Sequence, residues 1–230
     1  MAEILELLSY GNTGWLDEIL AGVLVTVVLA LCTAPLALLL GFLAALAKQS
    51  QHFELRLASR LYTTVFRSLP ELVTLFLIFF GLPLLIQAVG IQVGVPTFVA
   101  GLIALGLTLG AYCAEVFSSA FRAIPNGQYE GAYALGIRPS RTMGLVIAPQ
   151  LFRIALPGLS NLWVILVKDT ALVSTIGLAE TLRQVSVANR VTKEPFLFYG
   201  IACLIYLVLT LGSVAVLNKA DAKLARSDAR

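Results

Sequence analysis

The feature that most restricts this sequence is an apolar stretch from Leu20 to Ala47 that contains no charged residue. A helix needs about 20 mostly apolar residues to cross a lipid bilayer, so this stretch is long enough to span one. Only 13% of the chain is charged, whereas soluble domains contain roughly 25% charged residues. This composition excludes a disordered chain, a coiled coil, a nucleic-acid-binding arm and an ordinary cytosolic enzyme. It predicts an all-α, polytopic membrane protein.

Four further apolar segments follow the first. We predict five membrane-spanning helices, at about 20–47, 61–87, 96–121, 152–179 and 196–217, which together form a transmembrane domain over 20–217. Pro35 is expected to bend the first helix. The polar triplet 168–170 interrupts the fourth span, and we predict that this helix is discontinuous and lines a cavity or is buried in protein. An N-terminal segment (1–19) and a C-terminal tail (218–230) flank the spans.

The basic residues fall in alternate loops. Twelve of the 16 lie in the loop between the first two spans, in the loop between the third and fourth, in the tail after the fifth, or within the first seven residues of the span that follows such a loop: Lys48, Arg56, Arg60, Arg67, Arg122, Arg138, Arg141, Arg153, Lys219, Lys223, Arg226 and Arg230. The positive-inside rule makes these loops cytoplasmic. The N-terminus is then periplasmic and the C-terminus cytoplasmic, as five spans require. The first 19 residues carry four acids and no base, which argues against a cleaved signal peptide.

The sequence lacks the motifs for disulfide pairing, metal binding and ATP binding. The three cysteines lie in apolar stretches without a C-x-x-C pair, and the single histidine, His52, has no ligand cluster around it. No lysine follows a glycine, so the chain has no P-loop for ATP. We therefore expect no cofactor in this chain, and any nucleotide-driven step must belong to another polypeptide.

The longest cytoplasmic loop, 122–151, has an ordered pattern. Residues 125–127 (Pro-Asn-Gly) favour a turn, and 128–135 favour a short helix that ends at Gly136. A second short helix is expected over 140–148, ending at Pro149. Two short helices joined by a turn would form a knob that a soluble partner binds by a helix-in-groove contact. The alternative is a loop that lies on the membrane surface, and the pattern alone does not choose between them.

The same loop resembles the EAA loop of ABC importer permeases. That pattern is Glu-Ala-Ala, three residues, Gly, nine residues, then Ile-x-Leu-Pro, and its spacing matches from Glu130 to Pro149. The sequence departs from it at Gly131, Val146 and Ala148, where it has small or apolar residues. The resemblance implies that the loop couples to an ATPase. The residues within the matched stretch that would do so are Glu130, Gly131, Ala132, Gly136, Ile147 and Pro149.

Other segments are similar to the polar amino acid subfamily, and to its histidine/lysine/arginine and octopine/nopaline branch. They are 67–72 (RSLPEL), 80–83 (FGLP), 111–115 (AYCAE), 123–128 (AIPNGQ) and 168–172 (KDTAL). The resemblance implies a type I ABC importer permease fold in a bacterial inner membrane. It implies half of a pathway for a polar, basic amino acid or an opine. The implied partners are a periplasmic substrate-binding protein, an ATPase dimer that binds ATP and Mg²⁺, and a second permease subunit, either a similar chain or a copy of this one.

Polar residues inside spans are the candidates for a substrate pathway. On the third helix one face carries Thr108, Tyr112, Glu115 and Ser119. This face lines a cavity in which Glu115 holds a substrate ammonium or guanidinium, or it forms a hydrogen-bond seam between helices.

Two other spans carry charges. Glu71 lies one turn after Arg67, where it either forms a structural ion pair with that arginine or reaches the substrate. Pro70 between them is expected to break the local hydrogen-bond ladder, so a third reading is a hinge that the charged pair latches near the inner mouth. On the fourth span Asn161 and Lys168 share a face, followed by Asp169. Lys168 is a candidate for the substrate carboxylate, or pairs with Asp169 or Glu115.

Two other functions remain as alternatives. An ion-coupled secondary transporter or channel would use the same charges, but it needs internal repeats that the sequence does not show. An intramembrane enzyme would need a nucleophile, for which only Ser160 or Ser174 with Lys168 is available, and no H-E-x-x-H or G-x-S-x-G motif is present. We therefore predict a transport subunit rather than an enzyme.

Overall fold

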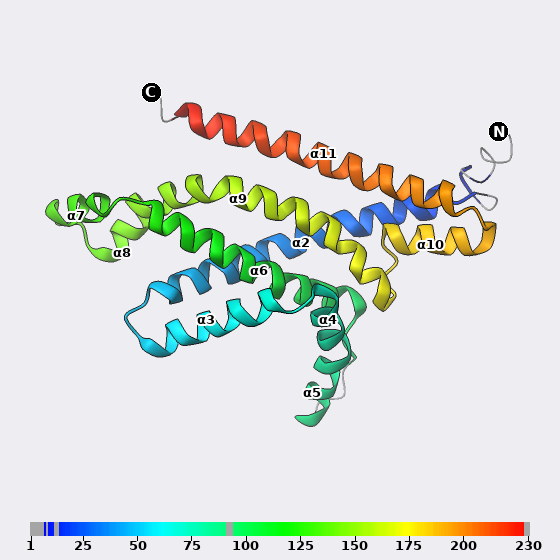
Figure 1. The fold of residues 1–230 in the computed structure, drawn as a ribbon, viewed down its shortest axis with the longest axis horizontal. Coiled ribbons are helices and arrows are strands. Elements are labelled where there is room, and N and C mark those ends of the chain that lie inside the picture. The colour runs from blue at the N-terminus through cyan, green and yellow to red at the C-terminus, as the bar shows by residue number, and fades with distance from the viewer. Residues whose placement is uncertain (1–6, 8, 12–13, 91–93, 228–230) are drawn as a thin grey trace. The chain divides into compact units, whose positions relative to one another are not determined.

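The computed structural model describes residues 7, 9–11, 14–90 and 94–227, with side chains through Lys219. Within these residues the chain is helical and contains no strand (Figure 1). The outer parts of the predicted N-terminal segment and cytoplasmic tail, and the middle of the predicted turn between the second and third spans, lie outside the described residues.

In the described part of the chain, five helical segments are long and apolar enough to cross a membrane, which confirms the predicted number of spans. They are Leu16–Gln49, Glu71–Ala88, Thr97–Ala123, Pro139–Ile176 and Pro195–Lys219. The first is the single helix α2 (Leu16–Gln49), which continues through Pro35. The third is α6 (Thr97–Ala123), and the fifth belongs to α11 (Pro195–Ser227), which extends beyond the predicted end of the span.

The single helix predicted over 61–87 is two helices. α3 (Phe53–Ser68) ends before Pro70, and α4 (Glu71–Phe76) begins after it. Pro70 has an extended backbone (φ −58°, ψ 137°) and no N–H to continue the helix, which explains the break. Sequence reasoning placed the proline inside one span because apolar residues continue on both sides of it.

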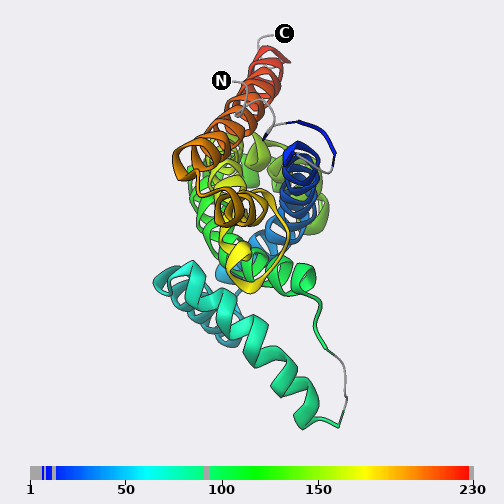
Figure 2. The ribbon, with the colours of Figure 1, turned by 90° about the vertical axis from the view of Figure 1, so that its right-hand side faces the viewer.

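The second span changes its winding. α4 is followed by a π-helical turn, η1 (Leu77–Gly81), and then by α5 (Leu82–Ala88), and the three form one continuous coil (teal in Figure 2). Pro83 lies just after this turn and cannot donate a backbone hydrogen bond into it. A missing donor of this kind favours a π-helical turn, because the neighbouring backbone N–H groups then bond to carbonyls five residues earlier instead of four.

The cytoplasmic loop leads directly into the fourth span. It contains α7 (Asn126–Ala134), α8 (Pro139–Thr142) and the π-helical turn η2 (Met143–Ile147). α9 (Ala148–Asp169) follows without interruption, so the predicted stop at Pro149 is wrong. Pro149 is the second residue of α9, in the first turn, where a missing N–H is tolerated.

The predicted discontinuity of the fourth span is a change of helix type. α9 runs through Lys168 and Asp169, and the chain then continues as a 3₁₀ helix, η3 (Thr170–Ile176). η3 ends at Gly177, whose φ of 93° is left-handed. A short amphipathic helix, α10 (Thr181–Thr192), precedes α11.

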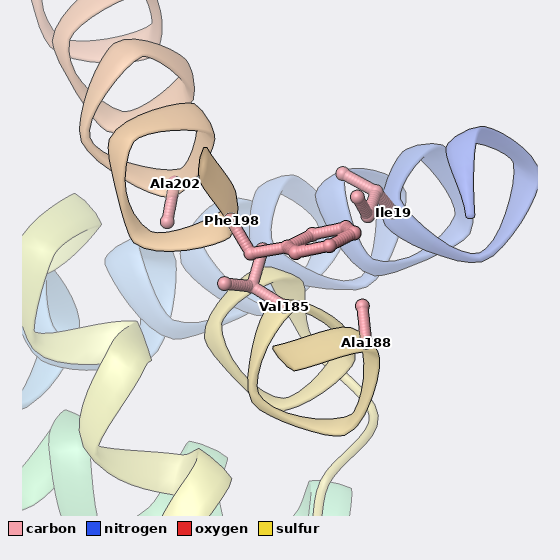
Figure 3. Packing of buried hydrophobic residues seen from close by; sticks show 5 residues of the cluster. All are labelled: Ile19, Val185, Ala188, Phe198 and Ala202. Atoms are coloured by element: carbon pink, nitrogen blue, oxygen red, sulfur yellow. The ribbon is translucent and has the colours of Figure 1, made fainter. Parts of the chain in front are cut away.

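The chain forms two compact units, each assembled from three separate segments. One unit comprises residues 1–35, 69–106 and 164–212, and the other comprises 36–68, 107–163 and 213–230. The first unit has an apolar core where α2, α10 and α11 meet. The ring of Phe198 lies among Ile19, Val185 and Ala188, with Ala202 beside it on α11 (Figure 3).

The second unit is held by small residues and aromatic rings. A Cβ at Gly41 of α2 would lie 2.4 Å from the Cβ of Cys113 on α6, so the two helices approach at a point where only glycine fits. Close approach through small residues is a common way for membrane helices to pack. The ring of Phe42 contacts those of Phe117 and Phe152, with centroids 5.5 and 5.8 Å away.

Candidate functional site

The helix α7 of the loop ends at Gly136 through backbone hydrogen bonds. The N–H of Gly136 donates to the carbonyl of Tyr133 (2.9 Å), and that of Ile137 donates to the carbonyl of Ala132 (3.0 Å). These two bonds form a Schellman motif, which requires a left-handed residue at the position of Gly136. Its φ is 72°, which confirms the predicted helix stop.

The residues expected to couple to an ATPase divide into a buried pair and an exposed set. α7 packs against α8 and η2, and the side chains of Ala132 on α7 and Ile147 on η2 are buried. Gln150 donates a hydrogen bond of 3.0 Å to Gln128 and ties the start of α9 to α7. The other members, Glu130, Gly131, Gly136 and Pro149, are exposed.

Large apolar side chains are exposed on the same loop. Leu135 is 81% exposed, Leu145 71% and Tyr133 50%. Exposed apolar residues next to an acid, on a compact helical knob, are suited to a protein contact. Two buried residues therefore hold the shape of the knob, while its surface remains available to a partner.

Glu115 on α6 forms an ion cluster within the second unit. Its carboxylate accepts a hydrogen bond from Lys48 Nζ, and Arg67 Nη1 lies 3.2 Å from the same oxygen. The Arg67 guanidinium also lies over the ring of Tyr112, 5.8 Å from its centroid. Glu115 therefore pairs with cations from α2 and α3 of its own unit.

Three other candidates lie in the first unit. Lys168 and Asp169 end α9, and Glu71 begins α4, which packs against η3. The charges of Glu71 and Asp169 interact with each other, so two acids and Lys168 gather at this junction. Lys168 is exposed and Asp169 is partly buried.

The predicted substrate-pathway residues thus fall into two groups. Glu71, Lys168 and Asp169 belong to one unit, and Tyr112, Glu115 and Asn161 belong to the other. The structure brings Glu71 near Asp169, and Tyr112 near the cluster of Glu115. Asn161 is exposed on α9. A substrate role for any of them stays a prediction.

Sequence reasoning missed a buried acid, Glu180, which it placed in an outer loop. Glu180 is fully buried at the start of α10, where its carboxylate accepts the N–H of Arg183 (2.8 Å). Tyr206 Oη and Thr26 Oγ1 donate to its other oxygen, at 2.7 and 3.3 Å. The available signal was the presence of Thr26 and Tyr206 inside apolar spans, because such groups must face protein rather than lipid.

A family model now identifies the chain. The model of the binding-protein-dependent transport system inner membrane component matches residues 37–220, which include the loop, α9 and the Glu115 cluster. The chain belongs to this family. It is a multi-pass permease of a bacterial inner membrane, and a transport component rather than an enzyme. Membership implies a substrate-binding protein and an ATPase as partners.

Named relatives extend over most of the permease. It is 40% identical to the nopaline transport system permease protein NocQ of Agrobacterium fabrum, over 90% of each chain. It is 42% identical to the histidine/lysine/arginine/ornithine transport system permease protein HisQ of Salmonella typhimurium, over 90% of this chain and 92% of the relative. It is 35% identical to the octopine transport system permease protein OccQ of Rhizobium meliloti, over 95% of each.

Solved structures agree with the family. A crystal structure of an amino acid ABC transporter with histidines contains a chain 32% identical to the permease, with a TM-score of 0.80. The match covers 91% of the permease and 95% of that chain. An inward-facing MetNI methionine ABC transporter matches with a TM-score of 0.72 at 15% identity, which shows the common fold, over 91% of the permease and 97% of that chain.

Proposed function

We propose that this permease forms half of the pathway by which an ATP-driven importer carries a basic amino acid or an opine. The observation that carries this proposal is the set of relatives, which span at least 90% of the chain at 35–42% identity. Their names specify nopaline, octopine and the basic amino acids. All these compounds carry a carboxylate together with positively charged nitrogen groups.

The charges of the first unit suit such a substrate. An α-amino acid needs a cation for its carboxylate and an anion for its ammonium, and a basic side chain needs a further acceptor. Lys168 supplies the cation, and Glu71 and Asp169 supply two anions at the junction of α9, η3 and α4. Bidentate pairing of a carboxylate with a guanidinium would favour arginine-like side chains.

The loop residues from Glu130 to Pro149 would connect the permease to its energy source. In this proposal they dock on an ATPase dimer, which binds the ATP and Mg²⁺. A second permease subunit, either a similar chain or a copy of this one, completes the pathway. The periplasmic binding protein delivers the substrate and favours one conformation by its differential affinity for the two states.

The test is substrate-stimulated ATP hydrolysis by the complete importer in proteoliposomes, with its binding protein, across basic, acidic and neutral amino acids and opines. Stimulation by basic amino acids or opines supports the proposal. Lys168→Met should lower this stimulation, whereas Lys219→Met, which removes an exposed lysine on α11, should not. Stimulation by only neutral or acidic amino acids would contradict the substrate class. Uptake driven by an ion gradient without ATP would favour the secondary transporter.

A further inference from the structure

A cavity of about 400 Å³ lies in the second unit, where the C-terminal ends of α2 and α6 meet the middle of α3. Its lining residues are Lys48, Gln49, Arg60, Ser118, Phe121 and Arg122. Ligand sites in proteins commonly measure about 300–1,000 Å³, so the cavity is large enough for a small polar group. All three of its bases are among the twelve that the charge distribution places on the cytoplasmic side.

The charges of the lining residues are not balanced. Lys48 is neutralised by Glu115, which lies outside the lining. Arg60 and Arg122 form no ion pair within the described residues, and Arg122 donates one hydrogen bond of 2.9 Å to Ser119. No acid lines the cavity. The guanidinium groups of Arg60 and Arg122 therefore have hydrogen-bond donors left for a ligand, and they give the cavity a net positive charge.

This chemistry fits a phosphate better than an amino acid. Guanidinium groups bind phosphate oxygens in pairs of parallel hydrogen bonds. An amino acid would also bring an ammonium group, but no acid is among the residues that line the cavity, and the Glu115 carboxylate already pairs with Lys48 and Arg67. The cavity therefore suits a ligand that is negatively charged and has no ammonium group of its own. Such a ligand pairs with the arginines and leaves none of its own charges unpaired.

Apolar side chains beside Arg60 indicate where such a phosphate comes from. Leu57 precedes Arg60 by about one turn on the same face of α3 and is 42% exposed, and Leu61 follows Leu57 by one turn and is 57% exposed. An amphiphile would place its phosphate on the arginines and its acyl chains on these leucines. Basic pockets between membrane helices on the cytoplasmic side are known to bind anionic lipid headgroups in this way.

We propose that the cavity between the C-terminal ends of α2 and α6 and the middle of α3 binds the phosphate headgroup of an anionic phospholipid of the inner leaflet, through Arg60 and Arg122. This site is separate from the residues assigned above to the substrate and to the ATPase. It does not depend on which substrate the importer carries. It does depend on the cytoplasmic orientation of these helix ends.

The experiment is lipid binding to the complete, delipidated importer, measured by native mass spectrometry. The probes are dioleoylphosphatidylglycerol and dioleoylphosphatidylcholine. Wild-type importer should retain the anionic lipid in preference to the zwitterionic one. Arg60→Gln or Arg122→Gln should each weaken binding of phosphatidylglycerol about fivefold, which corresponds to one cation near an anionic surface. Two separate variants keep the test valid if one of them fails to assemble.

The matched control is Lys219→Gln, which removes one exposed cytoplasmic charge outside the cavity. It should leave lipid binding unchanged. Equal binding of the two lipids, or equal losses in the control and the arginine variants, would overturn the proposal. A third arm adds inorganic phosphate to importer held in phosphatidylcholine. Saturable phosphate binding that Arg60→Gln abolishes, without any preference for phosphatidylglycerol, would assign the cavity to a soluble anion and reject the lipid.

Discussion

The hydroxyl of Tyr206 donates a hydrogen bond of 2.7 Å to the carboxylate of Glu180. The two residues come from α11 and the start of α10, and Thr26 of α2 donates to the same oxygen. Glu180 is therefore the point where three helices of one unit share a buried polar contact. Close by, the core around Phe198 joins the same three helices through apolar packing.

Tyr206→Phe should destabilise the permease. The change removes one donor and leaves the buried carboxylate under-satisfied, which costs about 1–3 kcal/mol. We expect a lower melting temperature of the assembled importer, measured by thermal unfolding in detergent. Tyr199→Phe is the matched control, because Tyr199 lies on the same helix and is exposed. Equal melting temperatures for wild type and Tyr206→Phe would show that the hydrogen bond does not stabilise the fold.

Glu180→Gln should change how stability depends on pH. Burial raises the pKa of the Glu180 carboxyl above its value in the unfolded chain. The stabilising contribution of such a group is fully present below its unfolded pKa, and is lost as pH rises through the folded pKa. Glutamine does not titrate but still accepts hydrogen bonds. The melting temperature of Glu180→Gln relative to wild type should therefore increase with pH.

The control for this experiment is Glu194→Gln, which replaces an exposed acid just before α11. Its melting temperature should follow that of wild type across the same pH range. A constant difference between Glu180→Gln and wild type at every pH would contradict the assigned role of burial.

Gly136→Ala should impair coupling, whereas Gly131→Ala should not. Gly136 has a φ of 72°, where a residue with a Cβ costs roughly 1–2 kcal/mol. Gly131 lies within α7 and a Cβ there would meet no atom within 4 Å, so alanine should fit. The measurement is substrate uptake at equal membrane levels of permease. Reduced uptake in both variants, or in neither, would contradict the proposed dependence on the helix end.

Lys48→Met and Glu115→Gln should each lower the stability of the permease. The double variant should lose less stability than the sum of the losses in the two single variants. Glu115→Gln leaves Lys48 without its ion-pair partner, and Lys48→Met leaves Glu115 with only Arg67. Because these side chains are partly exposed, the coupling should be only on the order of 1 kcal/mol. A double-mutant cycle in thermal unfolding measures this coupling. Strict additivity would show that the pair contributes nothing.

Gly101→Ala should disturb η3, and Val173→Ala should relieve the effect. A Cβ at Gly101 on α6 would lie 2.7 Å from Cγ1 of Val173, so one of the two must move. We expect a lower melting temperature and weaker substrate stimulation in Gly101→Ala, and recovery of both in Gly101→Ala/Val173→Ala. Recovery in the double variant would separate local crowding from a general loss of folding.

The sequence predicted what depends on local pattern. The five spans follow from apolar length, and the stop at Gly136 follows from its position before Pro139. Pro70 was expected to break the hydrogen-bond ladder within one span, but not to divide that span into two helices, because apolar residues continue on both sides of it. The π-helical turns were also missed, since apolar periodicity does not distinguish them from α-helix.

The contacts of the candidate sites depend on residues far apart in the chain. Glu115 pairs with Lys48, 67 positions away, and Glu180 pairs with Thr26, 154 positions away. Neither spacing has a local signature, so sequence reasoning did not find Lys48 as a partner of Glu115, and it placed Glu180 in the outer loop after the fourth span. The pattern of a single sequence indicates which polar side chains must face away from lipid, but not which of these side chains contact one another.

The 3₁₀ winding of η3 makes the segment after Lys168 longer than an α-helix of the same residues. A 3₁₀ helix rises about 2.0 Å per residue and an α-helix about 1.5 Å. Rewinding the seven residues of η3 as α-helix would shorten the segment by about 3.5 Å and turn Gly177 by about 140° relative to Lys168. A change of winding in η3 would therefore change both the length of this segment and the orientation of Gly177 relative to Lys168 and Asp169. The segment would stay helical throughout such a change.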